Sequence, residues 1–84
     1  MFYVYVLKSL KDKSLYIGFT KDLKRRFAEH NSGKSEYTST KAPYELIYYE
    51  SYKAFKDAIL REKNLKRFAK GFGQLKKRLQ FSLQ

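Results

Sequence analysis

An arginine and a histidine spaced four residues apart are the first candidates for chemistry. Positions 23, 26, 27 and 30 have the spacing of the inward stripe of an amphipathic helix, and two of them hold Arg26 and His30. Side chains at this separation project together from a helix. An arginine on a partly buried face needs an anion, either a protein carboxylate or a substrate phosphate. His30 alone would equally suit a hydrogen bond at the helix end, whereas the pair favours a functional site.

A carboxylate stands in a second apolar stripe. Glu62 shares a predicted helix face with four apolar residues between positions 55 and 65. A carboxylate there is costly unless it pairs with a cation or binds a metal. Two interpretations stay open, a salt bridge with Arg26 or Arg61 and a ligand for a hard divalent cation. Mg²⁺ often uses one or two carboxylates and takes its other ligands from water and substrate phosphate.

A strand tyrosine is the third candidate. Tyr16, Gly18 and Thr20 share one face of a predicted strand, and Gly18 would leave a gap beside Tyr16 for a backbone or a ligand. A tyrosine beside a basic cluster can have its pKa of about 10 lowered and then accept a proton from water. Core packing or stacking is the more common role of a single tyrosine, and both roles remain open.

The elements that must position these residues follow from hydrophobic periodicity. Alternating apolar residues predict strands over residues 2–8, 15–19 and 44–52, and the first two are close enough to form an antiparallel hairpin. A helix is expected from residue 21 to about 31, with Thr20 as its N-cap. It should end at Asn31-Ser32-Gly33.

The second half of the chain changes from strand to helix. In the third strand, Leu46, Tyr48 and Glu50 are expected on one face and the intervening residues on the other. A helix is expected from residue 53 to about 70, and leucines at i, i+4 spacing after two glycines predict a short final helix. The order β-β-α-β-α-α indicates one α+β domain over residues 1–84, with a basic helical C-terminal segment at about 71–84.

The composition removes several functional classes. The 84 residues include no cysteine and one histidine, which excludes disulfides, thiolate zinc sites and histidine-rich metal sites. The longest apolar run, residues 2–7, is far shorter than the ~20 residues of a membrane span. No signal-peptide pattern precedes this run, so a cytoplasmic location is expected.

The charge indicates a polyanionic partner. Nineteen basic and eight acidic residues give a net charge of +11, and nucleic acid is the commonest polyanion. Residues 51–84 hold ten basic and two acidic side chains, which gives +8. A basic C-terminal arm would give a surface that follows the phosphates of a nucleic acid. The alternative, an ordinary solvated helix face, explains the lysines but not the shortage of glutamates. Tyr37 and Phe72 are candidates for stacking on bases or for packing. The predicted phosphate contacts are Arg25, Lys34, Lys41, Lys63, Lys66, Arg67 and Lys70.

Together these residues resemble the GIY-YIG nuclease family. Tyr3-Val4-Tyr5 stands where the family has its first tripeptide, with a tyrosine in place of the glycine, and Tyr16-Ile17-Gly18 matches the second. Residues 18–31 follow the family's Thr-x-Asp-Leu-x-x-Arg-aromatic-x-x-His element, which is far more specific than a tripeptide. Arg61-Glu62-Lys63 fits the acidic segment of short family members. The resemblance covers residues 2 to about 68.

The resemblance implies a small central three-stranded antiparallel sheet flanked by helices and hydrolysis of a nucleic-acid phosphodiester. By the resemblance, Glu62 would hold one Mg²⁺ or Mn²⁺ and Arg26 would bind the scissile phosphate. Tyr16 is the first choice for the group that takes a proton from the attacking water, and Tyr5 is the second. His30 would orient a tyrosine or assist proton transfer.

The predicted function is therefore a metal-dependent DNA nuclease of low sequence specificity, a monomer or weak dimer. The alternatives are a non-catalytic nucleic-acid-binding module with the same fold and a basic protein-interaction domain. Many family members have a late supporting asparagine. Here only Asn64 follows Glu62, and it is too close in sequence to take that role. Gln74 or Gln80 would substitute, or the role is absent.

Overall fold

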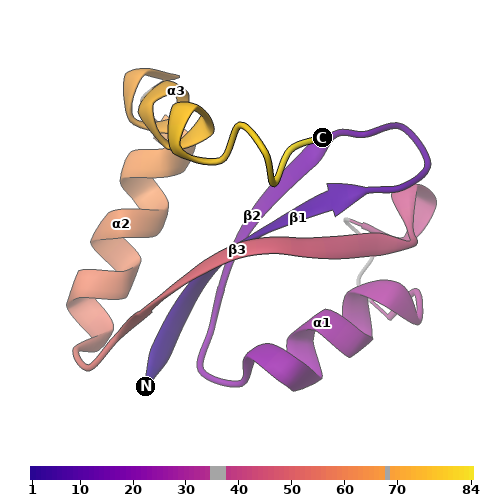
Figure 1. Cartoon of the computed structure of the whole chain (residues 1–84). Helices are drawn as coiled ribbons and strands as arrows, with labels where there is room; N and C mark the ends of the chain where they lie inside the picture. Colours follow the sequence, from indigo (N-terminus) through magenta and orange to yellow (C-terminus); the bar gives the residue numbers. More distant parts are fainter. Residues whose placement is uncertain (35–37, 68) are drawn as a thin grey trace.

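A three-stranded antiparallel sheet forms the centre of the molecule (Figure 1). The computed structural model describes residues 1–34, 38–67 and 69–84, without the side chains of residues 69–72. The strands are β1 (Phe2–Ser9), β2 (Leu15–Thr20) and β3 (Tyr44–Tyr52). They lie in the order β2-β1-β3, and both pairings are antiparallel, so the three predicted strands and the hairpin are confirmed.

Helices cover both faces of this sheet. The helix α1 (Leu23–Asn31) lies on one face, and α2 (Phe55–Arg67) and α3 (Ala69–Arg78) lie on the other (Figure 1). A short 3₁₀ helix, η1 (Ser39–Lys41), precedes β3. The predicted α+β class is confirmed. No helix within the described parts of the chain is long and apolar enough to span a membrane.

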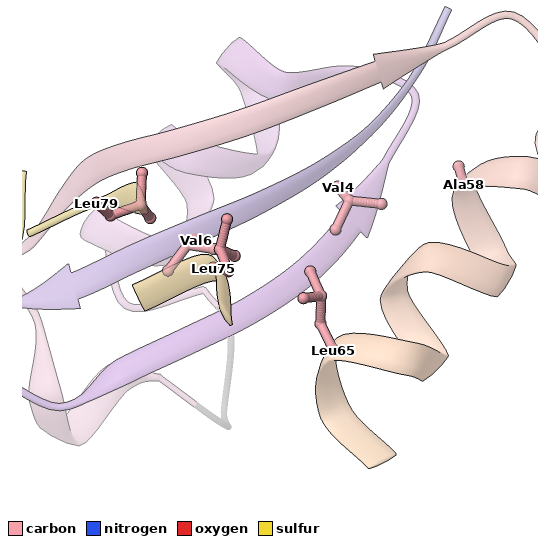
Figure 2. Packing of buried hydrophobic residues seen from close by; sticks show 6 residues of the cluster. All are labelled: Val4, Val6, Ala58, Leu65, Leu75 and Leu79. Carbon is pink, nitrogen blue, oxygen red and sulfur yellow. The ribbon is translucent and has the colours of Figure 1, made fainter. Parts of the chain in front are cut away.

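The central strand β1 is buried on both faces. One face of β1 packs against α2 and α3, and the other packs against α1. Because both faces of β1 are buried, its sequence is a continuous apolar run and not an alternation of apolar and polar residues. Figure 2 shows the larger cluster, which consists of Val4, Val6, Ala58, Leu65, Leu75 and Leu79. The smaller cluster consists of Tyr5, Leu7 and Tyr44.

A β-bulge in β3 corrects one predicted face. Val6 of β1 pairs with Tyr48, and the next residue, Leu7, pairs with Leu46. Two steps along β3 therefore match one step along β1, and Ile47 is the extra residue. Leu46 packs on the α1 side, whereas Tyr48 packs on the α2 and α3 side. The expectation that Leu46 shares a face with Tyr48 is wrong, because the extra residue interrupts the alternation.

The start of α1 also differs from the prediction. The N-cap is Asp22 rather than Thr20, because the Asp22 carboxylate accepts a hydrogen bond from the backbone N–H of Arg25 at 3.2 Å. The Thr20 hydroxyl instead accepts a hydrogen bond from the backbone N–H of Asp22 at 3.0 Å. Both residue types suit an N-cap, and the turn between them decides which one is used.

The break between the C-terminal helices lies earlier than predicted. The helix α2 ends at Arg67 and α3 begins at Ala69, so both Gly71 and Gly73 lie inside α3. A glycine weakens a helix by only about 1 kcal/mol, which tertiary packing can offset. The predicted leucine stripe does pack on the sheet, since the leucines of this region join the larger core cluster.

Candidate active site

A buried hydrogen-bonded chain connects β1, α1 and the segment before η1. The hydroxyl of Tyr5 lies 2.8 Å from Nε2 of His30, and Nδ1 of His30 lies 2.7 Å from the hydroxyl of Thr38. The exposed fractions of the three residues are at most 1%. Both nitrogens of the imidazole thus have a partner, and either tautomer of His30 can be satisfied because both partners are hydroxyls.

This chain is uncharged at neutral pH. Burial, together with the nearby Tyr16, raises the pKa of Tyr5 to about 12, although Arg26 opposes the shift. Burial and the charge of Arg26 lower the pKa of His30. Tyr5 therefore keeps its proton and His30 stays neutral. Tyr5 is suited to donate or relay a hydrogen bond, and it is a poor first acceptor for a proton from water.

Gly18 makes room for the ring of Tyr5. The two residues are paired neighbours on β2 and β1. A Cβ atom at Gly18 would overlap the phenol carbon and the hydroxyl of Tyr5. The gap predicted beside Tyr16 is thus filled by Tyr5, and the glycine serves the buried hydrogen-bonded chain rather than a ligand.

Tyr16 lies between this buried chain and α2. Its ring centroid is 5.0 Å from that of His30, in an edge-on arrangement. On its other side, Nζ of Lys66 lies 5.8 Å from the Tyr16 ring centroid. Lys66 also lies 3.4 Å from the carboxylate of Glu62, one helical turn earlier in α2. The edge strand β2 therefore brings Tyr16 to the place where α2 presents Glu62 and Lys66.

The ion pair of Glu62 differs from the one that the sequence suggested. Its partner is Lys66, whereas Arg26 pairs with Glu29 at 3.2 Å and Arg61 pairs with Glu50. Arg61 is held by both oxygens of the Glu50 carboxylate, at 2.8 and 3.0 Å. The two predicted partners of Glu62 thus pair with other carboxylates. Glu62 pairs instead with Lys66, the lysine that contacts Tyr16.

Arg26 extends from α1 toward the tyrosines. Burial opposes its charge, but its contacts with Glu29 and with Tyr5 raise its pKa. Tyr16 acts on the Arg26 charge in the same direction. The side chain is one-third exposed, at 33%. A guanidinium that is partly desolvated, fixed by a neighbouring carboxylate and still open to solvent suits the binding of an incoming phosphate.

The structure brings four of the predicted catalytic residues together, and Glu62 lies close enough for its charge to act on them. Tyr5 bonds to His30, Tyr16 packs on His30, and the charges of Arg26 and Glu62 both act on Tyr5. The residues come from both layers of the fold, since α1 and α2 lie on opposite faces of the sheet (Figure 1). The sequence pattern indicates four of these positions and the family resemblance adds Tyr5, whereas Thr38 was missed because a loop residue has no periodic signal.

The donor set suits one metal ion with few protein ligands. Among the residues that the structure describes, no three histidine or carboxylate side chains gather into a metal cage. The Glu62 side chain is 19% exposed and already faces a cationic group, Lys66. A carboxylate in this position fits Mg²⁺ or Mn²⁺ that completes its coordination with water and substrate phosphate.

The predicted phosphate contacts are spread over several parts of the molecule. Three of them are paired with carboxylates: Arg25 with Asp22, Lys41 with Asp12, and Lys66 with Glu62. The others that can be placed, Lys34, Lys63 and Arg67, are exposed. Lys66 belongs to the cluster around Tyr16. Tyr37 lies outside the described residues, and the side chains of Lys70 and Phe72 are among those not described.

The two glutamines expected to replace the late asparagine lie in other surroundings than Tyr16 and His30. Gln74 lines a pocket of about 360 Å³ with Glu50 and Arg61, on the face of the sheet that α2 and α3 cover. Gln80 is exposed beyond the end of α3, and Asn64 is exposed on α2.

Comparison with known families shows which family the chain belongs to. The family model for the GIY-YIG catalytic domain matches residues 1–77. The chain belongs to the GIY-YIG family. Proteins of the GIY-YIG family are generally nucleases, and all five predicted catalytic residues lie within the matched range.

Curated relatives of this GIY-YIG protein have names that state no activity. A UPF0213 protein of Staphylococcus haemolyticus is 42% identical over 69 residues, which cover 81% of this chain and 83% of that protein. A UPF0213 protein of Streptococcus pneumoniae serotype 4 is 46% identical over 66 residues, 77% of this chain and 66% of that protein.

A solved structure has the same GIY-YIG-like fold. The solution NMR structure of a UPF0213 protein from Bacillus halodurans matches with a TM-score of 0.56 and 35% identity. The match covers 89% of this chain and 82% of that chain. The fold assignment therefore has support from a solved relative as well as from the family model.

Proposed function

We propose that this GIY-YIG protein is a metal-dependent nuclease that hydrolyses DNA phosphodiester bonds with low sequence specificity. The observation that carries the proposal is the position of Tyr16 between a buried neutral relay and a carboxylate–ammonium pair. Phosphodiester hydrolysis needs an oriented nucleophile and neutralisation of charge on the phosphate. The cluster offers a group for each of these needs.

Arg26 binds the scissile phosphate in this proposal. Its guanidinium exchanges part of its contact with Glu29 for the phosphate oxygens, and it offers the planar fork that suits them. Tyr16, in its phenolate form, accepts the proton of the attacking water and becomes a phenol. It is half-buried beside the cluster, whereas Tyr5 is enclosed. Tyr5 and His30, which are hydrogen-bonded to each other, give Tyr16 a polar but uncharged environment.

Glu62 holds the divalent cation. When bound, the cation supplies charge neutralisation at the phosphate and lowers the pKa of coordinated water. Lys66, which pairs with this carboxylate in the structure, would then be available to contact the phosphate backbone with its ammonium. The high positive charge of the chain favours DNA over an acidic protein surface as the partner. The protein acts in the cytoplasm as a monomer or weak dimer in this proposal.

The test is a cleavage assay with Mg²⁺ or Mn²⁺ on duplex, flap and single-stranded DNA. Wild-type protein should cut at least one substrate, and Glu62→Gln should remove cutting while DNA affinity changes little. The matched control is Glu45→Gln, which removes an exposed carboxylate from β3. Salt-sensitive DNA binding without cutting would show a non-catalytic nucleic-acid binder, and negligible DNA affinity would favour a protein-interaction domain.

A further inference from the structure

A second pocket lies between α1 and β3, on the flank of α1 away from β2. Its volume is about 490 Å³, and its walls are mainly apolar and aromatic. The wall residues are Tyr3, Leu23, Phe27, Leu46 and Tyr49. The bulge in β3 helps to form the pocket, because it turns Leu46 and Tyr49 toward α1.

Two tyrosine rings form the open side of this pocket. The centroids of Tyr3 and Tyr49 are 5.9 Å apart, and their planes meet at 65°. This edge-on contact fixes the rings while Tyr49 remains 52% exposed. A fixed and exposed aromatic ring offers a flat apolar surface on which another flat ring can stack.

The rim of the pocket is cationic. Lys21 and Lys24 lie at the rim and are exposed. The remaining charged rim residue, Asp22, is engaged by Arg25, which contacts its carboxylate through the backbone N–H at 3.2 Å and through Nε at 3.9 Å. The pocket thus combines an aromatic interior with free positive charge at its entrance. A nucleotide, with its flat base and its phosphate, has the complementary pair of features.

The pocket is close enough to the candidate active site to serve the same DNA strand. Tyr3 and Tyr5 are two residues apart on one face of β1, which corresponds to about 7 Å along the strand. Phe27 directly follows Arg26 in α1. A strand whose phosphate contacts Arg26 can therefore pass the N-terminal end of α1 and place a base of a neighbouring nucleotide between α1 and β3.

We propose that this pocket receives an unpaired base of the substrate DNA, with Lys21 and Lys24 at its phosphate. The inference rests on the proposed nuclease function, because it names the part of the DNA that the protein binds next to the scissile phosphodiester. Bases inside a duplex are stacked on their neighbours and do not enter such a pocket, so the pocket selects single-stranded ends, flaps or gaps.

Tryptophan fluorescence tests the proposal directly, because the chain contains no tryptophan. The indole introduced by Tyr49→Trp should be quenched by a short oligothymidylate. An abasic oligonucleotide of the same length and charge should leave the fluorescence unchanged. Quenching by both oligonucleotides, or by neither, would overturn the proposal, and absence of quenching is also the outcome expected if the pocket binds a protein segment.

Affinity measurements supply the second readout. Tyr49→Ala should weaken binding of oligothymidylate about 5- to 100-fold, the range for loss of one base–aromatic stack. Tyr49→Phe should keep wild-type affinity, because the ring remains. Phe81→Ala is the matched control, since Phe81 is 77% exposed and lies beyond α3. Equal losses for oligothymidylate and the abasic oligonucleotide would also overturn the proposal.

The outcome separates this inference from the proposed function. If wild-type protein cuts DNA but Tyr49→Ala binds oligothymidylate normally, the base pocket fails and the nuclease stands. If base-dependent quenching occurs without any cleavage by the wild type, the pocket stands and the nuclease proposal fails.

Discussion

The ammonium of Lys66 lies 3.4 Å from the carboxylate of Glu62, one turn apart on α2. The pair places a protein cation where the proposed metal would bind. If Glu62 binds the metal as proposed, metal ion and lysine would compete for one carboxylate in the substrate-free protein, and this competition can be measured without any cleavage.

Lys66→Gln should strengthen binding of Mn²⁺ by about 2- to 5-fold, because removal of the partly exposed lysine ends a competition worth at most about 1 kcal/mol. Isothermal titration calorimetry in the absence of DNA gives the affinity. The matched control is Lys63→Gln, which removes the same charge from the residue next to Glu62. Equal affinities for the wild type and both variants would contradict competition by Lys66.

Tyr16→Phe should lower kcat about 100-fold or more without a change in DNA affinity, because general-base catalysis contributes about 10²–10⁴-fold. Tyr5→Phe should act differently. It leaves Nε2 of buried His30 without its partner, which should cost about 1–3 kcal/mol of stability. Single-turnover kinetics and urea denaturation of both variants separate the two effects. A larger loss of kcat at Tyr5 than at Tyr16 would reverse the assigned roles.

Gly18→Ala should destabilise the fold by about 1–3 kcal/mol, since the added methyl group meets the Tyr5 ring in a packed core. Gly73→Ala provides the control, because a Cβ atom there has no neighbour within 4 Å and alanine favours the helix. It should be neutral or stabilising by up to about 1 kcal/mol. Thermal denaturation followed by circular dichroism measures both, and a neutral Gly18→Ala would disprove the close packing.

Stability should fall as the pH falls below about 6.5, in part through His30. Its folded-state pKa is lowered by burial and by Arg26, so the unfolded chain takes up a proton at a pH where the folded chain does not. The stabilisation is present above the unfolded pKa and is lost as the pH falls through the folded pKa. Urea denaturation should show a smaller loss between about pH 7 and pH 5 for His30→Gln.

A direct measurement covers the case in which that variant does not fold. His30 is the only histidine, so its imidazole signals in an NMR pH titration of the wild type are unambiguous. A midpoint at or above about 6.5 would contradict the depressed pKa.

The sequence predicts the strands of this fold better than its helix ends. Alternating apolar residues predict β3 over residues 44–52, as observed. The bulge at Ile47 could not be predicted, since an extra residue appears only when β3 is aligned with β1. The predicted N-cap of α1 is wrong because Thr20 and Asp22 both have capping side chains, and the sequence alone does not distinguish them.

The candidate site shows the same division between local and non-local information. Arg26 and His30 are visible from sequence because one helix carries both. The role of Thr38 depends on a contact with His30, which lies in another element. The pairing of Glu62 with Lys66 could not be predicted because several cations were possible partners. The residue that fills the gap at Gly18 is also non-local, since it is Tyr5 on the neighbouring strand.

The position of β1 between two helical layers has a consequence for local opening of the molecule. Its backbone amides pair with strands on both sides and are shielded by side chains above and below. Amide hydrogen exchange should therefore be slowest in β1, because only global unfolding frees these groups. Tyr5 is anchored in this most protected segment. Fraying of the chain ends would leave its contact with His30 undisturbed, so the innermost part of the site should persist until the whole domain unfolds.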